Sequence, residues 1–163
     1  MKVISAISKI LKYIVIIIIA AMLTTLVIPK FVGYTPYTVI TGSMEPKYHV
    51  GCVTYVKPVD FDELKDGDVI TFTTGSLTVT HRIVSIDKEK QTVITKGDAN
   101  NTEDGSIAYS NIKGKATDFS IPYLGYAIVW VSTIKGKILL LIILAGLSAA
   151  SAILKSLSSD QAS

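Results

Sequence analysis

Two long uncharged apolar runs, one near each end of the chain, restrict the possible folds of this 163-residue sequence more than any other feature. Residues 13–29 carry no charge, and apolar neighbours on both sides extend this run to about 20 residues, enough for a helix that crosses a bilayer. A second uncharged run occupies residues 138–154. The stretch between them has ordinary polarity and is long enough to bury only a small core. The sequence therefore predicts one small domain held between two membrane-associated ends.

Lysines around the first run predict its orientation. Lys2, Lys9 and Lys12 precede the run, whereas only Lys30 follows it closely. Because positive charge favours the cytoplasmic side, we expect a cytoplasmic N-terminus and a central domain on the other side of the membrane. A cleaved signal peptide is the competing interpretation. The run is longer than a usual signal-peptide core and no small-x-small site follows it, which favours a retained anchor.

The C-terminal end predicts a second membrane element. Residues 126–134 are apolar and contain Trp130, which suits a membrane interface, and residues 138–154 could span the bilayer. Lys135 and Lys137 would lie on the outer side, against the usual charge bias. A buried core helix is the alternative, but the central domain is too small to cover it. The expected organisation is an N-terminal transmembrane anchor at 1–32, a β domain at 33–125, an interfacial segment with a second transmembrane helix at 126–155, and a polar tail at 156–163.

The central region reads as an all-β domain. Short alternating or β-branched stretches are separated by turn residues, which is typical of antiparallel strands. We expect strands at residues 37–40, 52–57, 69–74, 77–86, 92–96 and 112–118. Alternation predicts that His81 shares a largely apolar face with Ile83 and Ser85. Residues 97–110, rich in Asp, Asn and Gly, are expected to form a loop.

Composition excludes several kinds of function. The formal net charge is only +3, and the lysines lie mostly beside the apolar runs, so the charge pattern indicates membrane topology and no nucleic-acid partner. Cys52 is the single cysteine, so no internal disulfide or cysteine-based metal site can form. The chain has no glycine pattern typical of nucleotide binding, and we expect no metal and no cofactor.

Three places supply groups suited to nucleophilic catalysis. Ser43 lies in a predicted sharp turn after a strand, His81 lies in a strand, and Asp98 and Asp104 lie in the loop after the next strand. A serine hydroxyl needs a base to take its proton, an imidazole can act as that base, and a carboxylate can orient the imidazole. Each residue alone also fits an ordinary structural role, as a polar turn, a buried histidine or a turn aspartate.

The order and wording of four segments resemble the type I signal peptidases, in the branch of the endoplasmic reticulum, archaea and some Gram-positive bacteria. These segments are Thr-Gly-Ser-Met-Glu-Pro at 41–46, Gly-Asp-Val-Ile-Thr-Phe at 67–72, Thr-His-Arg-Ile-Val at 80–84 and Lys-Gly-Asp-Ala-Asn-Asn at 96–101. The resemblance runs from the first apolar segment to about Gly125. It implies a mainly β fold, a small signal-peptidase or LexA-like β domain flanked by N-terminal and C-terminal transmembrane helices.

The same resemblance assigns roles by motif position. It implies that Ser43 is the nucleophile, that His81 is the general base where the bacterial branch carries a lysine, and that Asp104 is the third member of the triad. Asp98 and Thr41 would support the site, Asp98 as the other loop carboxylate and Thr41 near the oxyanion hole. From the residues alone, either aspartate could reach His81, and the sequence leaves that choice open.

Two positions depart from the family pattern. Cys52 stands where the family usually has Asp after Gly, and we interpret it as a small buried hydrophobic residue. Ala99 stands where Asn is common, which affects the expected hydrogen bonds inside the loop. The sequon at residues 100–102 lies so close to the candidate site that a glycan would obstruct it, so we treat it as chance.

The resemblance implies a membrane-bound serine endopeptidase that removes signal peptides from translocated precursors and cuts after small residues. Its partners would be signal peptides, the lipid bilayer and the protein translocation machinery, and its site would be extracytoplasmic, or luminal in a eukaryote. One alternative is a catalytically inactive, membrane-tethered β module that binds a secreted partner. A self-cleaving repressor of the LexA type is a second alternative, but the chain has no helix-turn-helix pattern and no suitable lysine beside His81.

Overall fold

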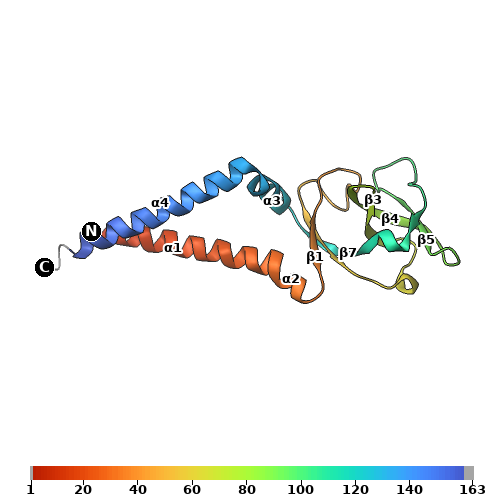
Figure 1. Cartoon of the computed structure of the whole chain (residues 1–163), viewed down its shortest axis with the longest axis horizontal. Helices are drawn as coiled ribbons and strands as arrows, with labels where there is room; N and C mark the ends of the chain where they lie inside the picture. Colours follow the sequence, from red (N-terminus) through yellow and green to blue (C-terminus); the bar gives the residue numbers. More distant parts are fainter. Residues whose placement is uncertain (1, 160–163) are drawn as a thin grey trace. The chain divides into compact units, whose positions relative to one another are not determined.

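A computed structural model describes residues 2–159 and divides the chain into two compact units (Figure 1). One unit, residues 26–127, contains every described strand. The other is helical and is built from the segments before and after it. The prediction of a mainly β centre between helical ends is confirmed at this level.

The β unit is one seven-stranded sheet in which every neighbouring pair is antiparallel. The strand order across the sheet is β1-β2-β7-β3-β4-β5-β6. The strands are β1 Thr35–Thr38, β2 Val53–Lys57, β3 Val69–Thr74, β4 Leu77–Asp87, β5 Thr92–Lys96, β6 Ile107–Ala108 and β7 Ile112–Ile121. Strands β3 and β5 have the predicted bounds, since both are β-branched runs between clear turn signals.

Three strand predictions are corrected by long-range pairing. Strand β1 begins and ends two residues before the predicted 37–40, although Val39 still exchanges backbone hydrogen bonds with residues 51 and 52. Strand β7 extends three residues past the predicted 112–118 because its far end pairs with β2. Strand β6 lies inside the predicted loop 97–110, where it pairs with β5. A two-residue strand carries no alternation of its own, so only its partner reveals it.

A bulge in β4 changes which side chains face the core. Ile83 pairs with Thr95, but Ser85 pairs with Ile94, so the register shifts at Val84. Ile86 consequently packs against the core cluster that contains Ile83, whereas Ser85 is exposed. The prediction that Ser85 shares the face of His81 and Ile83 is therefore wrong, because simple alternation assumes an unbroken ladder.

Two hydrophobic clusters form the core, and one of them holds the segment that carries Ser43. The first cluster contains Phe61, Leu64, Ile70, Phe72, Ile83, Val93 and Ile107. The second contains Met44, Tyr48, Cys52, Val56, Val69 and Ala116. Cys52 is 1% exposed, which confirms it as a small buried residue. Because fully burying one large side chain contributes about 1.5–3 kcal/mol, Met44 and Tyr48 anchor the turn around Ser43 firmly.

The N-terminal helical segment contains one stretch, Lys12–Phe31, that is long and apolar enough to cross a membrane. It comprises the end of α1 (Lys2–Met22), a π-helical turn (Leu23–Val27) and α2 (Ile28–Phe31). Within that turn region, the hydroxyls of Thr24 and Thr25 donate to the carbonyls four residues earlier, a local substitute for regular helix bonds. Length and composition thus allow the predicted N-terminal span.

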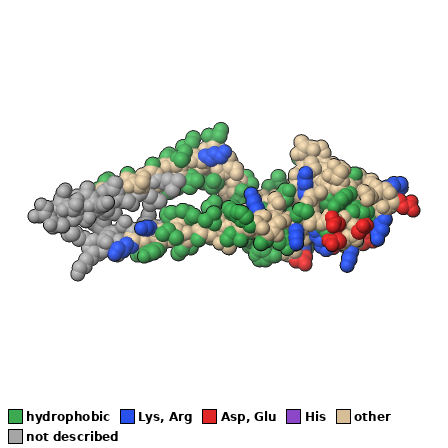
Figure 2. Space-filling model, turned by 60° about the horizontal axis from the view of Figure 1, so that its bottom comes forward, with side chains coloured by type: hydrophobic (Ala, Val, Ile, Leu, Met, Phe, Trp, Pro, Cys, Tyr) green, Lys and Arg blue, Asp and Glu red, His purple; other side chains and the backbone are tan. Residues whose placement is uncertain are grey.

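The C-terminal helices meet the same length and composition requirement only as a bent pair. Helices α3 (Leu124–Ser132) and α4 (Ile134–Ser159) are separated at Thr133, and the candidate pair is bent by 93°. Hydrophobic side chains cover the described parts of the helices, whereas acidic side chains gather on the β unit (Figure 2). Part of the predicted polar tail, up to Ser159, is helical, and residues 160–163 lie outside the described residues.

Candidate active site

Ser43 lies in the turn segment between β1 and β2, and hydrogen bonds made by residues of this segment stabilise the turn. Glu45 accepts a hydrogen bond from the backbone N–H of Val50 at 3.2 Å through one carboxylate oxygen. The other oxygen lies 2.5 Å from Nδ1 of His49. Beneath the turn, the buried Tyr48 donates its hydroxyl hydrogen to the carbonyl of Thr117 at 2.5 Å. Packing and hydrogen bonds together fix the backbone that presents the Ser43 hydroxyl.

His81 reaches Ser43 from the middle of β4. It is only 6% exposed, and its backbone pairs with Ile70 of β3. The edge of its ring meets the ring of Phe72, with centroids 6.2 Å apart and planes at 69°. The Nε2 atom of His81 lies 3.1 Å from Oγ of Ser43, within hydrogen-bond distance. A strand and a distant turn thus bring an imidazole and a hydroxyl into contact.

Asp104 occupies the other side of the same imidazole. Its Oδ2 atom lies 2.5 Å from Nδ1 of His81. An ionised carboxylate can only accept, so this hydrogen bond requires the imidazole hydrogen on Nδ1. In the neutral ring, Nε2 is then free to accept the hydroxyl hydrogen of Ser43. The three side chains form a continuous Ser43–His81–Asp104 relay, and the choice that the sequence left open falls geometrically on Asp104.

Asp98 binds Arg82, and none of its hydrogen bonds in the described part of the chain reaches the His81 ring. Its two carboxylate oxygens accept hydrogen bonds from Nε and Nη2 of Arg82 at 2.8 and 2.6 Å. Arg82 also donates through Nη1 to the carbonyl of Gly67 at 2.8 Å. The hydrogen bonds that Arg82 donates to the Asp98 carboxylate raise the pKa of the Arg82 guanidinium above its ordinary value. Consecutive strand residues point to opposite faces, so His81 and Arg82 hold one loop through two different carboxylates.

Thr41 lies beside the reactive oxygen. Its Oγ1 atom is 3.4 Å from Oγ of Ser43, the long end of hydrogen-bond distances. Both residues are at least partly exposed, so this side of the turn is open to an approaching molecule. The structure therefore brings Thr41, Ser43, His81 and Asp104 together, and separates Asp98 from the imidazole.

Two further residues shape the site and escaped the sequence reasoning. Thr95, which is fully buried, donates its hydroxyl hydrogen to Oδ2 of Asp104 at 2.5 Å. Gly97 lies so close to the Ser43 turn that an added Cβ would stand 2.7 Å from the Ser43 carbonyl oxygen. The next contact, from the N–H of Ala99 to the same oxygen at 2.9 Å, joins the loop to the turn.

A sequence signal for Thr95 existed. Alternation in β5 places Thr95 on the same face as Val93, and both are buried. A threonine on the buried face of a strand needs a hydrogen-bond partner, because an unpaired buried hydroxyl is costly. That requirement predicts a polar neighbour without identifying it. For Gly97, only its position directly after a strand was available.

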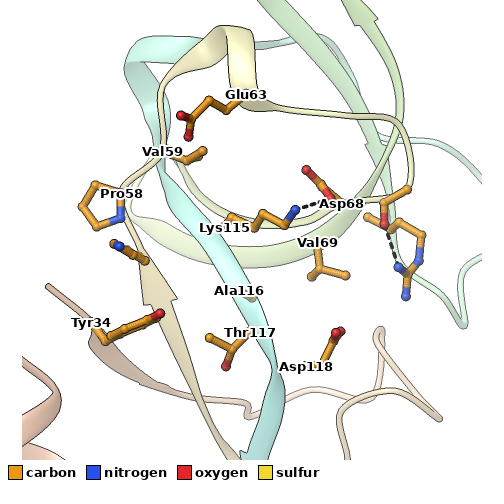
Figure 3. A pocket seen from close by; sticks show the side chains of 13 residues that line it. Tyr34, Pro58, Val59, Glu63, Asp68, Val69, Lys115, Ala116, Thr117 and Asp118 are labelled. Atoms are coloured by element: carbon orange, nitrogen blue, oxygen red, sulfur yellow. Dashed lines mark hydrogen bonds and ion pairs between the residues drawn. The ribbon is translucent and has the colours of Figure 1, made fainter. Parts of the chain in front are cut away.

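A cavity of about 520 Å³ lies elsewhere on the β unit (Figure 3). Its lining includes the Lys115–Asp68 ion pair, with a nitrogen-to-oxygen distance of 2.6 Å, but neither Ser43 nor His81. Positive and negative side chains are interspersed around it. Within the part of the chain that the structure describes, no group of three or more His, Cys, Asp or Glu side chains is placed to hold a metal ion.

Comparison with known proteins points to one family. The family model described as "Signal peptidase, peptidase S26" matches residues 8–104, a range that includes Ser43, His81 and Asp104. Signal peptidase I W of Bacillus subtilis is 39% identical over 123 residues, which cover 68% of this chain and 65% of that protein. The signal peptidase complex catalytic subunit SEC11 of Zygosaccharomyces rouxii is 32% identical over 126 residues, covering 68% of this chain and 74% of the relative. The chain thus spans slightly less than two thirds of the Bacillus protein.

Proposed function

Because the chain belongs to the signal peptidase family, peptidase S26, we propose that it is a membrane-bound serine endopeptidase that removes signal peptides from precursor proteins, cutting after small residues. The observation that carries the mechanism is the unbroken chain of contacts from Ser43 Oγ to His81 Nε2 and from His81 Nδ1 to Asp104 Oδ2. A nucleophile, a base and an orienting carboxylate in hydrogen-bond contact form the arrangement required for acyl transfer.

In this proposal His81 moves one proton in each half of the reaction. As Ser43 Oγ attacks the carbonyl carbon before the scissile bond, its proton passes to Nε2 of His81. His81 then gives that proton to the leaving amine, and the bond breaks to leave an acyl ester on Ser43. Water attacks the ester, loses a proton to His81, and Ser43 regains it as the signal peptide leaves. Asp104 stays ionised and stabilises the imidazolium that forms in each half.

The oxyanion would be stabilised by the N–H of Ser43 and the hydroxyl of Thr41. The substrate carbonyl carbon bonds to Ser43 Oγ in the tetrahedral intermediate. The Thr41 hydroxyl lies next to Ser43 Oγ, and therefore close to where the oxyanion on that carbon would form. Donors aimed at a developing negative charge usually supply a large share of catalysis. The support for Thr41 is that it is exposed and that its hydroxyl lies 3.4 Å from Oγ of Ser43.

The substrate would bind in extended form. Strand β1 is an outer strand of the sheet and leads directly toward the Ser43 turn. An extended peptide added along its free edge would gain main-chain hydrogen bonds, with pockets for alternate side chains selecting small residues near the cut. The similar proteins are named signal peptidases, and this chain belongs to the same family. We therefore propose secretory precursors as its substrate class.

Membrane placement follows from the two apolar ends. We propose an anchor at 1–32 with a cytoplasmic N-terminus, a catalytic domain at 33–125 outside the cytoplasm or in the lumen, an interfacial segment and second membrane helix at 126–155, and a polar tail at 156–163. The Lys12–Phe31 stretch supports the first helix, and the bent α3–α4 pair is compatible with the second. A catalytic domain held at the bilayer meets precursors as they emerge, so the translocation machinery is the proposed partner.

Cleavage by the full-length protein in proteoliposomes, with a purified precursor as substrate, tests this function. We expect a single cut after a small residue and acylation of Ser43 by a serine-directed probe. Ser43→Ala should abolish both signals while the protein stays folded, because one oxygen is removed from a turn whose anchors are Met44 and Tyr48. Ser76→Ala, in the exposed turn between β3 and β4, is the matched control and should behave as wild type. Labelling of neither serine, with no cleavage, would instead support the inactive binding module.

A further inference from the structure

We propose that Thr95 is a positioning residue of the active site, which holds the Asp104 carboxylate so that it selects one tautomer of His81. The inference rests on the proposed function for its kinetic part. Neither the family motifs used above nor the alternation of β5 assigns any role to this threonine. The contacts that support it lie on both the main chain and the side chain of Asp104.

Thr95 contacts Asp104 at two points. Its hydroxyl donates to Oδ2 of Asp104 at 2.5 Å, and its carbonyl accepts the Asp104 backbone N–H at 2.7 Å. Two contacts from one residue fix both the position of the Asp104 backbone and the rotation of its carboxylate. The same Oδ2 atom accepts the Nδ1–H of His81 at 2.5 Å. One oxygen therefore receives two donors, and rotation of the carboxylate would break both bonds.

The two contacts from Thr95 are needed because Asp104 lies far along a loop. Seven residues, 97–103, separate it from the end of β5, and its side chain is 28% exposed. A partly exposed carboxylate can be hydrated and can turn away from the ring. Thr95 does not share that freedom, since it is fully buried in β5 and pairs with Ile83 two residues beyond His81 on β4. Its branched side chain is also restricted at χ1.

The consequence for chemistry concerns the imidazole hydrogen. A fixed Oδ2 holds the hydrogen on Nδ1, which leaves Nε2 unprotonated toward Ser43. Without the Thr95 hydroxyl, the carboxylate gains rotational freedom and the ring can populate the tautomer with hydrogen on Nε2. That tautomer cannot accept the proton of Ser43. We therefore expect loss of the Thr95 hydroxyl to lower kcat and to leave KM little changed, because the peptide-binding edge is untouched.

Thr95→Val tests the proposal in the full-length protein, since valine keeps the shape and removes the hydroxyl. We expect kcat to fall about tenfold to a hundredfold, the range for losing a hydrogen bond to a charged group. Thr95→Ser should restore most of it. Thr71→Val is the matched control: Thr71 is equally buried and its hydroxyl bonds to Thr80 at 2.7 Å, away from Asp104. It should lose stability without losing kcat in its folded fraction. An equal effect of Thr71→Val and Thr95→Val on kcat would overturn the proposal.

A second readout separates this inference from the proposed function. The chain has two histidines, so ¹⁵N-histidine labelling with His49→Gln as an assignment control isolates the ring nitrogens of His81. We expect the wild type to show mainly the Nδ1–H form and Thr95→Val a mixture, whether or not a precursor is cleaved. An unchanged tautomer ratio in Thr95→Val would overturn the inference. If Thr95→Val does not fold, Thr95→Ser against Thr95→Ala decides, because these differ mainly by the hydroxyl.

Discussion

Asp98 and Arg82 form a two-point ion pair, with donor-to-acceptor distances of 2.8 and 2.6 Å, and Arg82 is the residue that follows His81 in the chain. Arg82 follows His81 in β4, so two consecutive residues of one strand hold the same loop through different aspartates. The two carboxylates consequently have separable tasks. Asp104 contacts the ring that would perform proton transfer, and Asp98 ties the loop to the sheet. Mutation of Asp104 should therefore mainly affect turnover, whereas mutation of Asp98 should mainly affect stability.

Asp104→Asn is expected to fold normally and to lose kcat by about 10⁴-fold, the size of effect seen when a triad carboxylate becomes an amide and the imidazole takes the wrong tautomer. The amide oxygen can still accept the Thr95 hydroxyl, so the loop should stay in place. Precursor turnover and a thermal melt of the same preparation check this. Activity close to that of wild type in a folded variant would remove Asp104 from the triad.

Asp98→Asn is expected to lose stability first, because the amide cannot form the charge-assisted fork with Arg82. The pair is partly exposed, at 36% for Arg82 and 17% for Asp98, so we expect a loss of about 1 kcal/mol in the free energy of unfolding. Activity should decline with the folded fraction. Arg82→Lys keeps the charge without the fork and should melt similarly. A fully folded but inactive Asp98→Asn variant would reverse the roles assigned to the two aspartates.

Gly97→Ala is expected to disturb the contact between the acidic loop and the Ser43 turn. The new Cβ would lie 2.7 Å from the carbonyl oxygen of Ser43, a backbone atom that cannot move aside cheaply. We expect a stability loss of about 1–3 kcal/mol, typical of overpacking, together with lower kcat because Ser43 is displaced. Gly105→Ala, in the same loop with no neighbour within 4 Å of its added Cβ, should be near neutral. Equal melts for the two variants would show that the close approach is unimportant.

Stability should fall at alkaline pH through Cys52. Burial raises the pKa of the Cys52 thiol above its ordinary value of 9.0, so the native protein keeps the proton that the unfolded chain releases. The stabilisation is complete below the unfolded pKa and is lost as pH rises toward the folded pKa. Urea unfolding of the β unit between about pH 7 and 10 should show a shallower pH dependence for Cys52→Ala than for wild type. Identical slopes would contradict the raised pKa of the thiol.

Much of the fold could be predicted because its signals are local. The β-branched alternation of β3 and β5 identified both strands with their bounds, and the length of the apolar run identified Lys12–Phe31. Cys52 was expected to be buried from its size and polarity alone, and it is. The bulge at Val84 and the short strand β6 were missed, since each exists only through pairing with β5.

The sequence by itself determined which chemical groups the site could contain: a serine at a turn, a histidine in a strand and two aspartates in one loop. Only the tertiary structure decided how they pair. Asp104 meets His81 because its backbone is bonded to Thr95, and the loop lies against the turn because Ala99 donates to the Ser43 carbonyl. These bonds join residues whose separation in the chain carries no periodic signal. Hydrogen-bond geometry at close range, and no property of the individual residues, therefore selects one carboxylate for the imidazole and the other for Arg82.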